Sequence, residues 1–254
     1  MARPRHDEAM GAGGWVVRWW RALLAELVST ALLVWLGCIT MVPLGGAAVP
    51  LTHPALTFGF IVVANACAFG EVSGAHMNPA VTLGALLYGK LDALPALGYV
   101  LAQLLGATLG FGGLLATSPQ DALAKSVAVT LPGAGVSVLA AVSIEVVLTG
   151  ALVLAVCGAW AAPDPTVPLK LGLVVAGLVY AGGPATGASL NPARSFAPAL
   201  LQGEWAHHWV YWVGPLLGGA LAALLHRWVL APRRAAAESP APPTDAEIPL
   251  NDKV

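Results

Sequence analysis

The sequence predicts an all-α membrane protein with six transmembrane helices, two re-entrant half-helices and an inverted repeat of three spans plus three. Two observations predict this fold class: a series of long apolar stretches, and a ten-residue segment that occurs twice. Of the 254 residues, 57% are hydrophobic and 10% are charged, against roughly a quarter charged in soluble domains. This composition and the net charge of -1 exclude a nucleic-acid binder, which needs a basic excess, and a disordered chain. The three cysteines suggest neither a disulfide framework nor a metal site.

Six apolar stretches approach or exceed the about 20 residues that a helix needs to cross the hydrocarbon layer. Glu26 lies in the first stretch and Glu145 in the fourth, and the fifth begins close to Lys170. The expected spans are residues 22–42, 51–69, 93–117, 136–162, a fifth from 167 onward, and 209–225. The first stretch is too long for the core of a cleavable signal peptide.

The basic residues indicate the orientation, because cytoplasmic connections of membrane proteins carry an excess of Lys and Arg. With six spans, the two termini and the even-numbered connections share one side of the membrane. That side carries ten of the twelve basic residues, namely Arg3, Arg5, Arg18, Arg21, Lys90, Lys170, Arg227, Arg233, Arg234 and Lys253. We therefore expect both termini in the cytoplasm, and the plasma membrane as the location.

A ten-residue segment beginning at Ser73 aligns with one beginning at Thr186, with five identical positions and an Asn-Pro-Ala tripeptide in each. Asn191 lies 113 residues (191 minus 78) after Asn78. Three spans and one such segment therefore occur twice, and because three is odd, the second copy enters the membrane from the opposite side. Inverted repeats of this kind place solute sites at the repeat interface near the bilayer centre.

Each Asn-Pro-Ala begins an apolar stretch too short to span, residues 78–88 and 191–202. Pro at the first helical position after an Asn cap is a good helix start, so we expect two half-helices that meet at their N-termini. The expected organisation is a cytoplasmic segment 1–17, a first repeat 18–117 with its re-entrant loop 73–88, an extracellular connection 118–135, a second repeat 136–230 with its re-entrant loop 186–202, and a flexible cytoplasmic tail 231–254.

At these residues the chain resembles an aquaporin of the major intrinsic protein family, over roughly residues 18–230. The resemblance implies a homotetramer in the lipid bilayer with one pore in each subunit. It implies a channel rather than an enzyme, with no cofactor, no metal and no nucleic-acid partner.

The resemblance also assigns roles to individual residues. The pore centre would be formed by the two tripeptides, Asn78, Pro79, Ala80, Asn191, Pro192 and Ala193. Backbone carbonyls of Gly74, Ala75, His76, Gly187, Ala188 and Ser189 would accept hydrogen bonds from passing molecules. Glu26 and Glu145 would hold the re-entrant loops in shape, although intramembrane carboxylates also occur in proton relays.

Arg194 is a charge within an apolar region, which is costly and usually marks a functional cavity. It matches the selectivity-filter arginine of the family, and Phe58, Val179 and Ala188 match the other filter positions. A shift of one residue in the fifth span would put Tyr180 in place of Val179. The strict water channels of the family usually have His there, so Val179 predicts a wider and less polar constriction. Ser195 and Ala199, in contrast, are typical of water channels rather than of glycerol facilitators.

We therefore expect a passive channel for water that also passes small neutral solutes such as glycerol, urea, ammonia or hydrogen peroxide, and excludes protons and ions. One alternative is a facilitator that mainly passes glycerol and other small solutes. Two others are a structural membrane protein with a closed pore and an ion-coupled transporter. An ion-coupled transporter would need titratable groups along its transport path. The expected spans contain only the carboxylates Glu26 and Glu145, and both are explained by support of the re-entrant loops.

Overall fold

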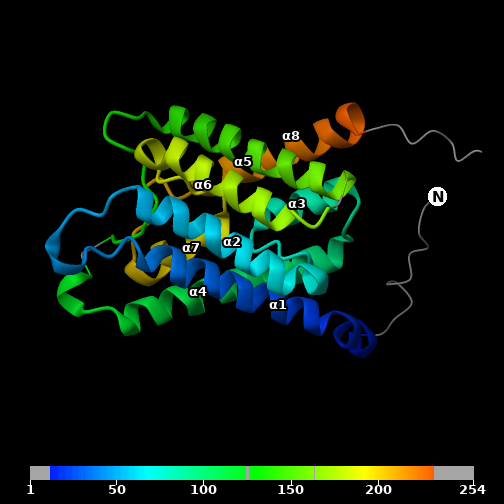
Figure 1. Ribbon diagram of the computed structural model, residues 1–254, viewed down its shortest axis with the longest axis horizontal. Helices are drawn as coiled ribbons and strands as arrows, with labels where there is room; N and C mark the ends of the chain where they lie inside the picture. The colour runs from blue at the N-terminus through cyan, green and yellow to red at the C-terminus, as the bar shows by residue number, and fades with distance from the viewer. Residues whose placement is uncertain (1–11, 124–125, 163, 232–254) are drawn as a thin grey trace, which may run out of the picture.

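The computed structural model describes residues 12–123, 126–162 and 164–231. The expected N-terminal segment, up to residue 11, and the expected tail, from residue 232, lie outside the described residues. In the described part the chain forms eight α-helices: α1 (Ala12–Ile39), α2 (Thr52–Ser73), α3 (Pro79–Tyr88), α4 (Ala93–Thr117), α5 (Val138–Ala161), α6 (Val167–Thr186), α7 (Pro192–Gln202) and α8 (Val210–Leu225). A short π-helical turn, η4 (His226–Leu230), continues α8. Figure 1 shows the long helices running side by side along the longest axis of the molecule.

Six of these helices are long and apolar enough to cross a membrane, which confirms the expected number of spans. The bounds differ most at α1, which begins at Ala12 rather than near residue 22. Its first turns carry Arg18 and Arg21, and long basic side chains can extend to the membrane surface while their stems cover apolar atoms. The helix therefore begins about ten residues before the apolar stretch begins.

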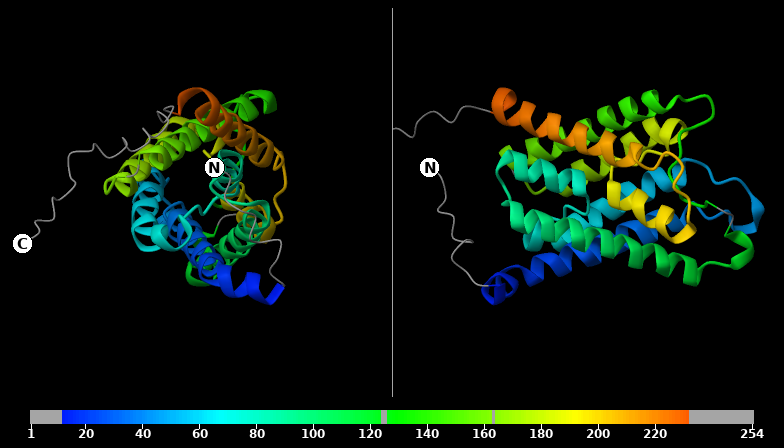
Figure 2. Two further views of the ribbon diagram at one scale, coloured as in Figure 1. Left: turned by 90° about the vertical axis from the view of Figure 1, so that its right-hand side faces the viewer. Right: turned by 180° about the vertical axis from the view of Figure 1, so that it is seen from behind.

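The packing of the spans follows the inverted repeat. The first span of each repeat packs on the third, as α1 on α4 and α5 on α8, and the two middle spans, α2 and α6, pack on each other. Each half-helix packs mainly against the other repeat, α3 on α8 and α7 on α4. In the left view of Figure 2 the helices are seen nearly end on, grouped around the long axis.

The half-helices α3 and α7 start where the sequence predicts and enter from opposite ends of the molecule (Figure 2, right). Each begins with Pro after an Asn N-cap and ends at a left-handed glycine, Gly89 at φ 86° and Gly203 at φ 69°. Glycine adopts this conformation without steric cost, which makes it a common residue after a helix end. Both N-termini therefore lie in the interior of the molecule.

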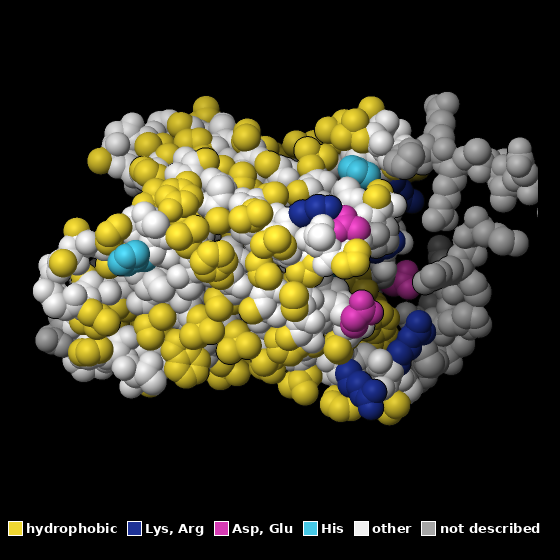
Figure 3. All heavy atoms as spheres, viewed as in Figure 1, with side chains coloured by type: hydrophobic (Ala, Val, Ile, Leu, Met, Phe, Trp, Pro, Cys, Tyr) yellow, Lys and Arg dark blue, Asp and Glu magenta, His cyan; other side chains and the backbone are white. Residues whose placement is uncertain are grey.

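The surface in Figure 3 has a wide apolar region, and the Lys and Arg side chains visible on this face gather toward the end where the described chain begins and ends. Exposed leucines on α4 illustrate the apolar region: Leu97, Leu101, Leu105 and Leu109 are each more than half exposed. In water such a surface would be unfavourable, and in a bilayer it faces lipid or a neighbouring subunit. The chain is an integral, multi-pass membrane protein.

Glycines allow the backbones of α1 and α4 to touch. A Cβ added to Gly106 would lie 2.2 Å from the carbonyl oxygen of Leu27, and one added to Gly110 would lie 2.2 Å from that of Ala31. The pair α5 and α8 repeats this arrangement, because a Cβ on Gly218 would lie 2.2 Å from the carbonyl oxygen of Val146. Small residues at such interfaces are the usual means of close helix packing in lipid.

This packing predicts that Gly110→Ala destabilises the protein, because the added methyl group meets backbone that cannot move aside. Overpacking of this kind costs about 1–3 kcal/mol, measured as a lower free energy of unfolding in detergent. Gly112→Ala on the same helix is the matched control, since its Cβ would lie 3.8 Å from Cδ1 of Leu201, an ordinary van der Waals contact. Equal stability of the two variants would contradict the view that the contact between α1 and α4 leaves no room for a methyl group at Gly110.

Candidate functional site

The two half-helices are joined at their N-terminal ends by reciprocal hydrogen bonds. The Asn78 side-chain amide donates to the carbonyl oxygen of Leu190 at 2.8 Å, and the Asn191 amide donates to that of Met77 at 2.7 Å. Each Asn also caps its own helix, because its side-chain oxygen accepts from the N–H of Ala80 or Ala193. Each amide nitrogen therefore donates one hydrogen to the facing loop and retains a second one.

The meeting point carries a positive potential. The N-terminus of a helix behaves as roughly half a positive elementary charge, because its first N–H groups have no partner within the helix. Two such ends face each other here, from α3 and α7. The combined field disfavours a cation at the centre of the molecule.

Glu26 on α1 holds the first re-entrant loop. One carboxylate oxygen accepts from the N–H of His76 at 2.8 Å and from the Ser73 hydroxyl at 2.6 Å. The other accepts from the N–H of Met77 and from the Gln103 side chain, both at 2.8 Å. Glu26 is completely buried, so four hydrogen bonds replace water around it.

Glu145 on α5 does the same in the second repeat. It is also completely buried. It accepts from the N–H of Ser189 and of Leu190, both at 2.9 Å, and from the Thr186 hydroxyl at 2.7 Å. The carboxylate of each repeat thus accepts from two backbone N–H groups at equivalent loop positions. It also accepts from a hydroxyl at the equivalent positions Ser73 and Thr186.

The held loops have matching strained backbones. In the first, Gly74, Ala75 and Met77 have φ values of 86°, 47° and 53°, and in the second, Gly187, Ala188 and Leu190 have 78°, 45° and 53°. Positive φ is unfavourable for residues with a Cβ. Hydrogen bonds from the loop backbone to a buried carboxylate offset this cost, so the two Glu residues determine the loop conformation.

A cavity of about 560 Å³ is lined by residues of both loops. Met41, Leu51 and Pro54 line one end, and Trp160, Asp164 and Pro165 line the other. Residues of both loops that the sequence predicts at the pore also line the cavity, together with the two asparagines. They are Gly74, Ala75, His76, Asn78, Gly187, Ala188, Ser189 and Asn191. Of the tripeptides, Pro79, Ala80, Pro192 and Ala193 lie in the first turns of α3 and α7.

All four filter residues of the sequence analysis line this cavity: Phe58, Val179, Ala188 and Arg194. The Arg194 guanidinium carbon lies 5.4 Å from the centre of the Phe58 ring, within the range of a cation–π contact. The alternative residue, Tyr180, has 41% of its surface exposed, and Val179 rather than Tyr180 lines the cavity in the described residues. The fifth span therefore has the register that gives a small apolar residue at this position.

Arg194 is held by the connection between the two repeats. Its Nη1 donates to the carbonyl oxygen of Ala128 at 2.8 Å, and its Nη2 contacts the Met41 sulfur at 3.4 Å. The hydroxyl of Thr130 in the same connection donates to Ser195 at 2.8 Å. Neither the loop contacts nor Met41 could be found from the sequence, because nothing in the repeat marks them.

Gln103 and Asn65 are buried polar residues that sequence reasoning missed. Gln103 donates to Glu26 and also to the Thr82 hydroxyl at 2.9 Å. Asn65 donates to the carbonyl oxygen of Ser29 at 2.8 Å. The sequence does contain a signal for both residues, because a side-chain amide within an otherwise apolar span needs a hydrogen-bond partner inside the protein.

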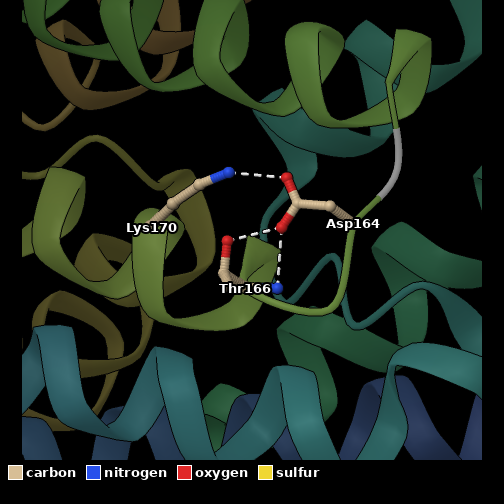
Figure 4. A network of polar contacts seen from close by, with 3 residues as sticks. All are labelled: Asp164, Thr166 and Lys170. Atoms are coloured by element: carbon tan, nitrogen blue, oxygen red, sulfur yellow. Dashed lines mark hydrogen bonds and ion pairs between the residues drawn. The ribbon is translucent and has the colours of Figure 1, made fainter.

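Charged groups occur again at the far end of the cavity, between α5 and α6. The Asp164 carboxylate contacts the Lys170 ammonium at 2.5 Å and accepts from the N–H and the hydroxyl of Thr166 (Figure 4). The hydrogen bond from Lys170, followed by those from Thr166, lowers the pKa of Asp164 to about 2. This carboxylate therefore remains ionised throughout the physiological pH range.

The loop contacts predict that Glu145→Leu abolishes or strongly reduces folding, because two backbone N–H groups lose their acceptor. Each unsatisfied buried donor costs about 1–3 kcal/mol, and Glu145→Gln, which keeps one acceptor oxygen, should lose less. Thermal unfolding of the purified protein measures both. Glu204→Gln, whose carboxylate accepts only an exposed N–H of Ala206 in the described residues, is the control, and equal losses in all three would contradict the assigned role.

Comparisons with known proteins agree with this geometry. The family model described as major intrinsic protein matches residues 15–226. The chain is 45% identical over 232 residues to aquaporin TIP4-4 of Zea mays, covering 87% of this chain and 89% of that protein. It is 34% identical to aquaporin-4 of Mus musculus, covering 87% of this chain and 70% of that protein.

A solved structure shows the same fold. The X-ray structure of the aquaglyceroporin from Plasmodium falciparum matches with a TM-score of 0.73 at 24% identity, over 84% of this chain and 97% of that one. The family match covers most of the chain, and the relatives align over most of their own length. The chain belongs to the major intrinsic protein family and is an aquaporin-type membrane channel rather than an enzyme.

Proposed function

We propose that this channel conducts water and small neutral solutes (glycerol, urea, ammonia and hydrogen peroxide) and excludes protons and ions. The observation that carries the proposal is a single cavity lined by both loops, by Asn78 and Asn191 at the opposed helix N-termini, and by Arg194. A narrow passage with a few hydrogen-bonding groups and a positive barrier is what selective neutral conduction requires.

Proton exclusion follows from donors at the centre. The second amide hydrogens of Asn78 and Asn191 would both donate to one passing water. A water that accepts two such bonds points its own hydrogens away from the centre, so it cannot relay a proton through it. The positive helix ends act in the same direction by disfavouring hydronium.

The loop backbones would supply the matching acceptors. The N–H groups of His76, Met77, Ser189 and Leu190 are turned toward the two carboxylates. We infer that carbonyl oxygens of the cavity-lining residues face the passing molecules, opposite apolar side chains such as Val156 and Val175. Such a one-sided ladder replaces part of the hydration of a solute without binding it tightly.

The constriction favours a solute range wider than water. Val179 and Ala188 present only methyl groups beside Arg194 and Phe58, so they leave room and offer no hydrogen bond. This supports the second candidate, a facilitator mainly for glycerol and similar solutes. The two candidates differ in the ratio of solute to water permeability.

The assembly and orientation are part of the proposal. We propose a homotetramer, with exposed apolar helix faces partly buried between subunits, and both termini in the cytoplasm. Arg18, Arg21, Lys90, Lys170 and Arg227 are the described basic residues that support this orientation. Crosslinking in membranes tests the tetramer, and labelling of single introduced cysteines from either side tests the orientation and the expected plasma-membrane location.

The central experiment is light scattering of proteoliposomes in stopped flow, with water, glycerol and urea gradients applied in parallel. Water flux well above that of empty vesicles, with a low activation energy and no proton current, is expected. Vesicles that shrink no faster than empty ones would contradict the proposal.

Val179→His is predicted to narrow the filter and make it more polar. The ratio of glycerol to water permeability should fall by at least about tenfold, the size of effect that small steric changes have on selectivity. Tyr180→His is the matched control, because its side chain is displaced by one position and largely faces away from the cavity. An unchanged ratio in Val179→His, or an equal change in the control, would show that Val179 does not set the cut-off.

A further inference from the structure

Met41 places a sulfur atom beside Arg194 in the cavity. It lies just beyond the end of α1, in a turn in which its N–H donates to the carbonyl oxygen of Cys38 at 2.9 Å. The side chain is half-buried and lines the cavity at the end opposite Asp164. Its sulfur lies 3.4 Å from Nη2 of Arg194, so it takes part in the environment of the filter arginine.

A thioether is an unusual partner for a guanidinium. It is a weak hydrogen-bond acceptor, and the other terminal nitrogen of Arg194 has a stronger one, the carbonyl oxygen of Ala128. The Nη2 group is therefore only weakly engaged and remains available to a molecule in the cavity. The strength of the acceptor at the Met41 position thus affects how tightly the donor is held.

We propose that Met41 is an oxidation site of this channel, and that peroxide in the solution at the Met41 end converts its thioether to a sulfoxide and lowers flux. A sulfur lone pair attacks one oxygen of hydrogen peroxide, the O–O bond breaks, and the sulfur–oxygen bond forms. The proton on the transferred oxygen moves to the departing oxygen, which leaves as water. Sulfur is oxidised and peroxide is reduced, with no other reactant.

Arg194 favours this step at Met41. Its Nη2 N–H lies beside the sulfur and can donate to the departing peroxide oxygen, which gains negative charge as the O–O bond breaks. The second described methionine, Met77, also borders the cavity, but only 4% of its surface is exposed, whereas Met41 is half-buried. Oxidation should therefore be faster at Met41.

The product changes the constriction. A sulfoxide is polar, and its oxygen is a far better acceptor than a thioether sulfur. It would form a charge-assisted hydrogen bond with Nη2 of Arg194, which would occupy the donor and place an additional oxygen atom in the passage. This flux consequence rests on the channel function proposed above, whereas the oxidation itself requires only access of peroxide to the cavity.

Cysteine oxidation is the competing explanation of any loss of flux. Cys38 and Cys157 are completely buried, whereas Cys67 is exposed and lines the cavity. Cysteine disulfides and sulfenic acids are reversed by dithiothreitol, and a methionine sulfoxide is not. This difference and the variant Cys67→Ser separate the two chemistries.

The experiment uses the full chain in proteoliposomes, treated with hydrogen peroxide and then with dithiothreitol. Peptide mass spectrometry follows the gain of one oxygen at Met41 and Met77, and stopped flow compares water flux with that of the same vesicles before treatment. We expect faster oxidation at Met41 than at Met77, and a fall in flux of about fivefold, equivalent to roughly 1 kcal/mol in the barrier. Cys67→Ser should respond like the native chain, and Met41→Leu, of similar volume, should keep its own starting flux after treatment.

If Met41 is oxidised no faster than Met77, the assignment of Met41 as the oxidation site is wrong. Complete oxidation with unchanged flux, or an equal loss of flux in Met41→Leu, would overturn its effect on conduction. If the untreated protein conducts no water, the channel proposal fails, and the mass spectrometry still decides whether Met41 is the oxidation site.

Discussion

Backbone N–H groups cannot be left without partners inside a membrane, and the two non-helical loops of this protein have to satisfy them there. Glu26 and Glu145 accept two N–H groups each, at distances of 2.8–2.9 Å. These bonds turn the donors of each loop toward one side and maintain φ values that residues with a Cβ otherwise avoid. Because the loop conformation positions both the asparagines and Arg194, the conducting path depends on these two buried carboxylates.

The helices around the loops form a frame in which the two repeats depend on each other. Each half-helix packs against the third span of the opposite repeat, and each asparagine donates to the opposite loop. Neither repeat could therefore form its half of the path alone. Backbone contact at Gly110 and Gly218 brings the spans close enough for this interlocking.

Much of the fold could be predicted from the sequence, because its strongest signals are local or repeated. The lengths of the apolar stretches indicate the six spans, and the two Asn-Pro-Ala segments indicate where α3 and α7 begin. The cross-loop bonds to Met77 and Leu190 could not be predicted, because each joins an asparagine side chain to a backbone carbonyl more than a hundred residues away. The contact of Met41 with Arg194 depends in the same way on tertiary structure, since Met41 belongs to a turn with no counterpart motif.

The repeat explains why the scaffold is symmetric while the lining is not. In the middle spans and re-entrant segments, positions 113 residues apart are equivalent, so Phe58 corresponds to Leu171, Val179 to Ala66 and Arg194 to Val81. All six line the cavity. An aromatic ring and a guanidinium at one end of the cavity thus have only aliphatic side chains at the equivalent positions of the other repeat. A single buried guanidinium incurs one desolvation cost, and a second charge at the equivalent place would incur another. Duplication therefore supplies the two carboxylates that the loops need, while divergence at a few lining positions confines the buried guanidinium to one end of the cavity.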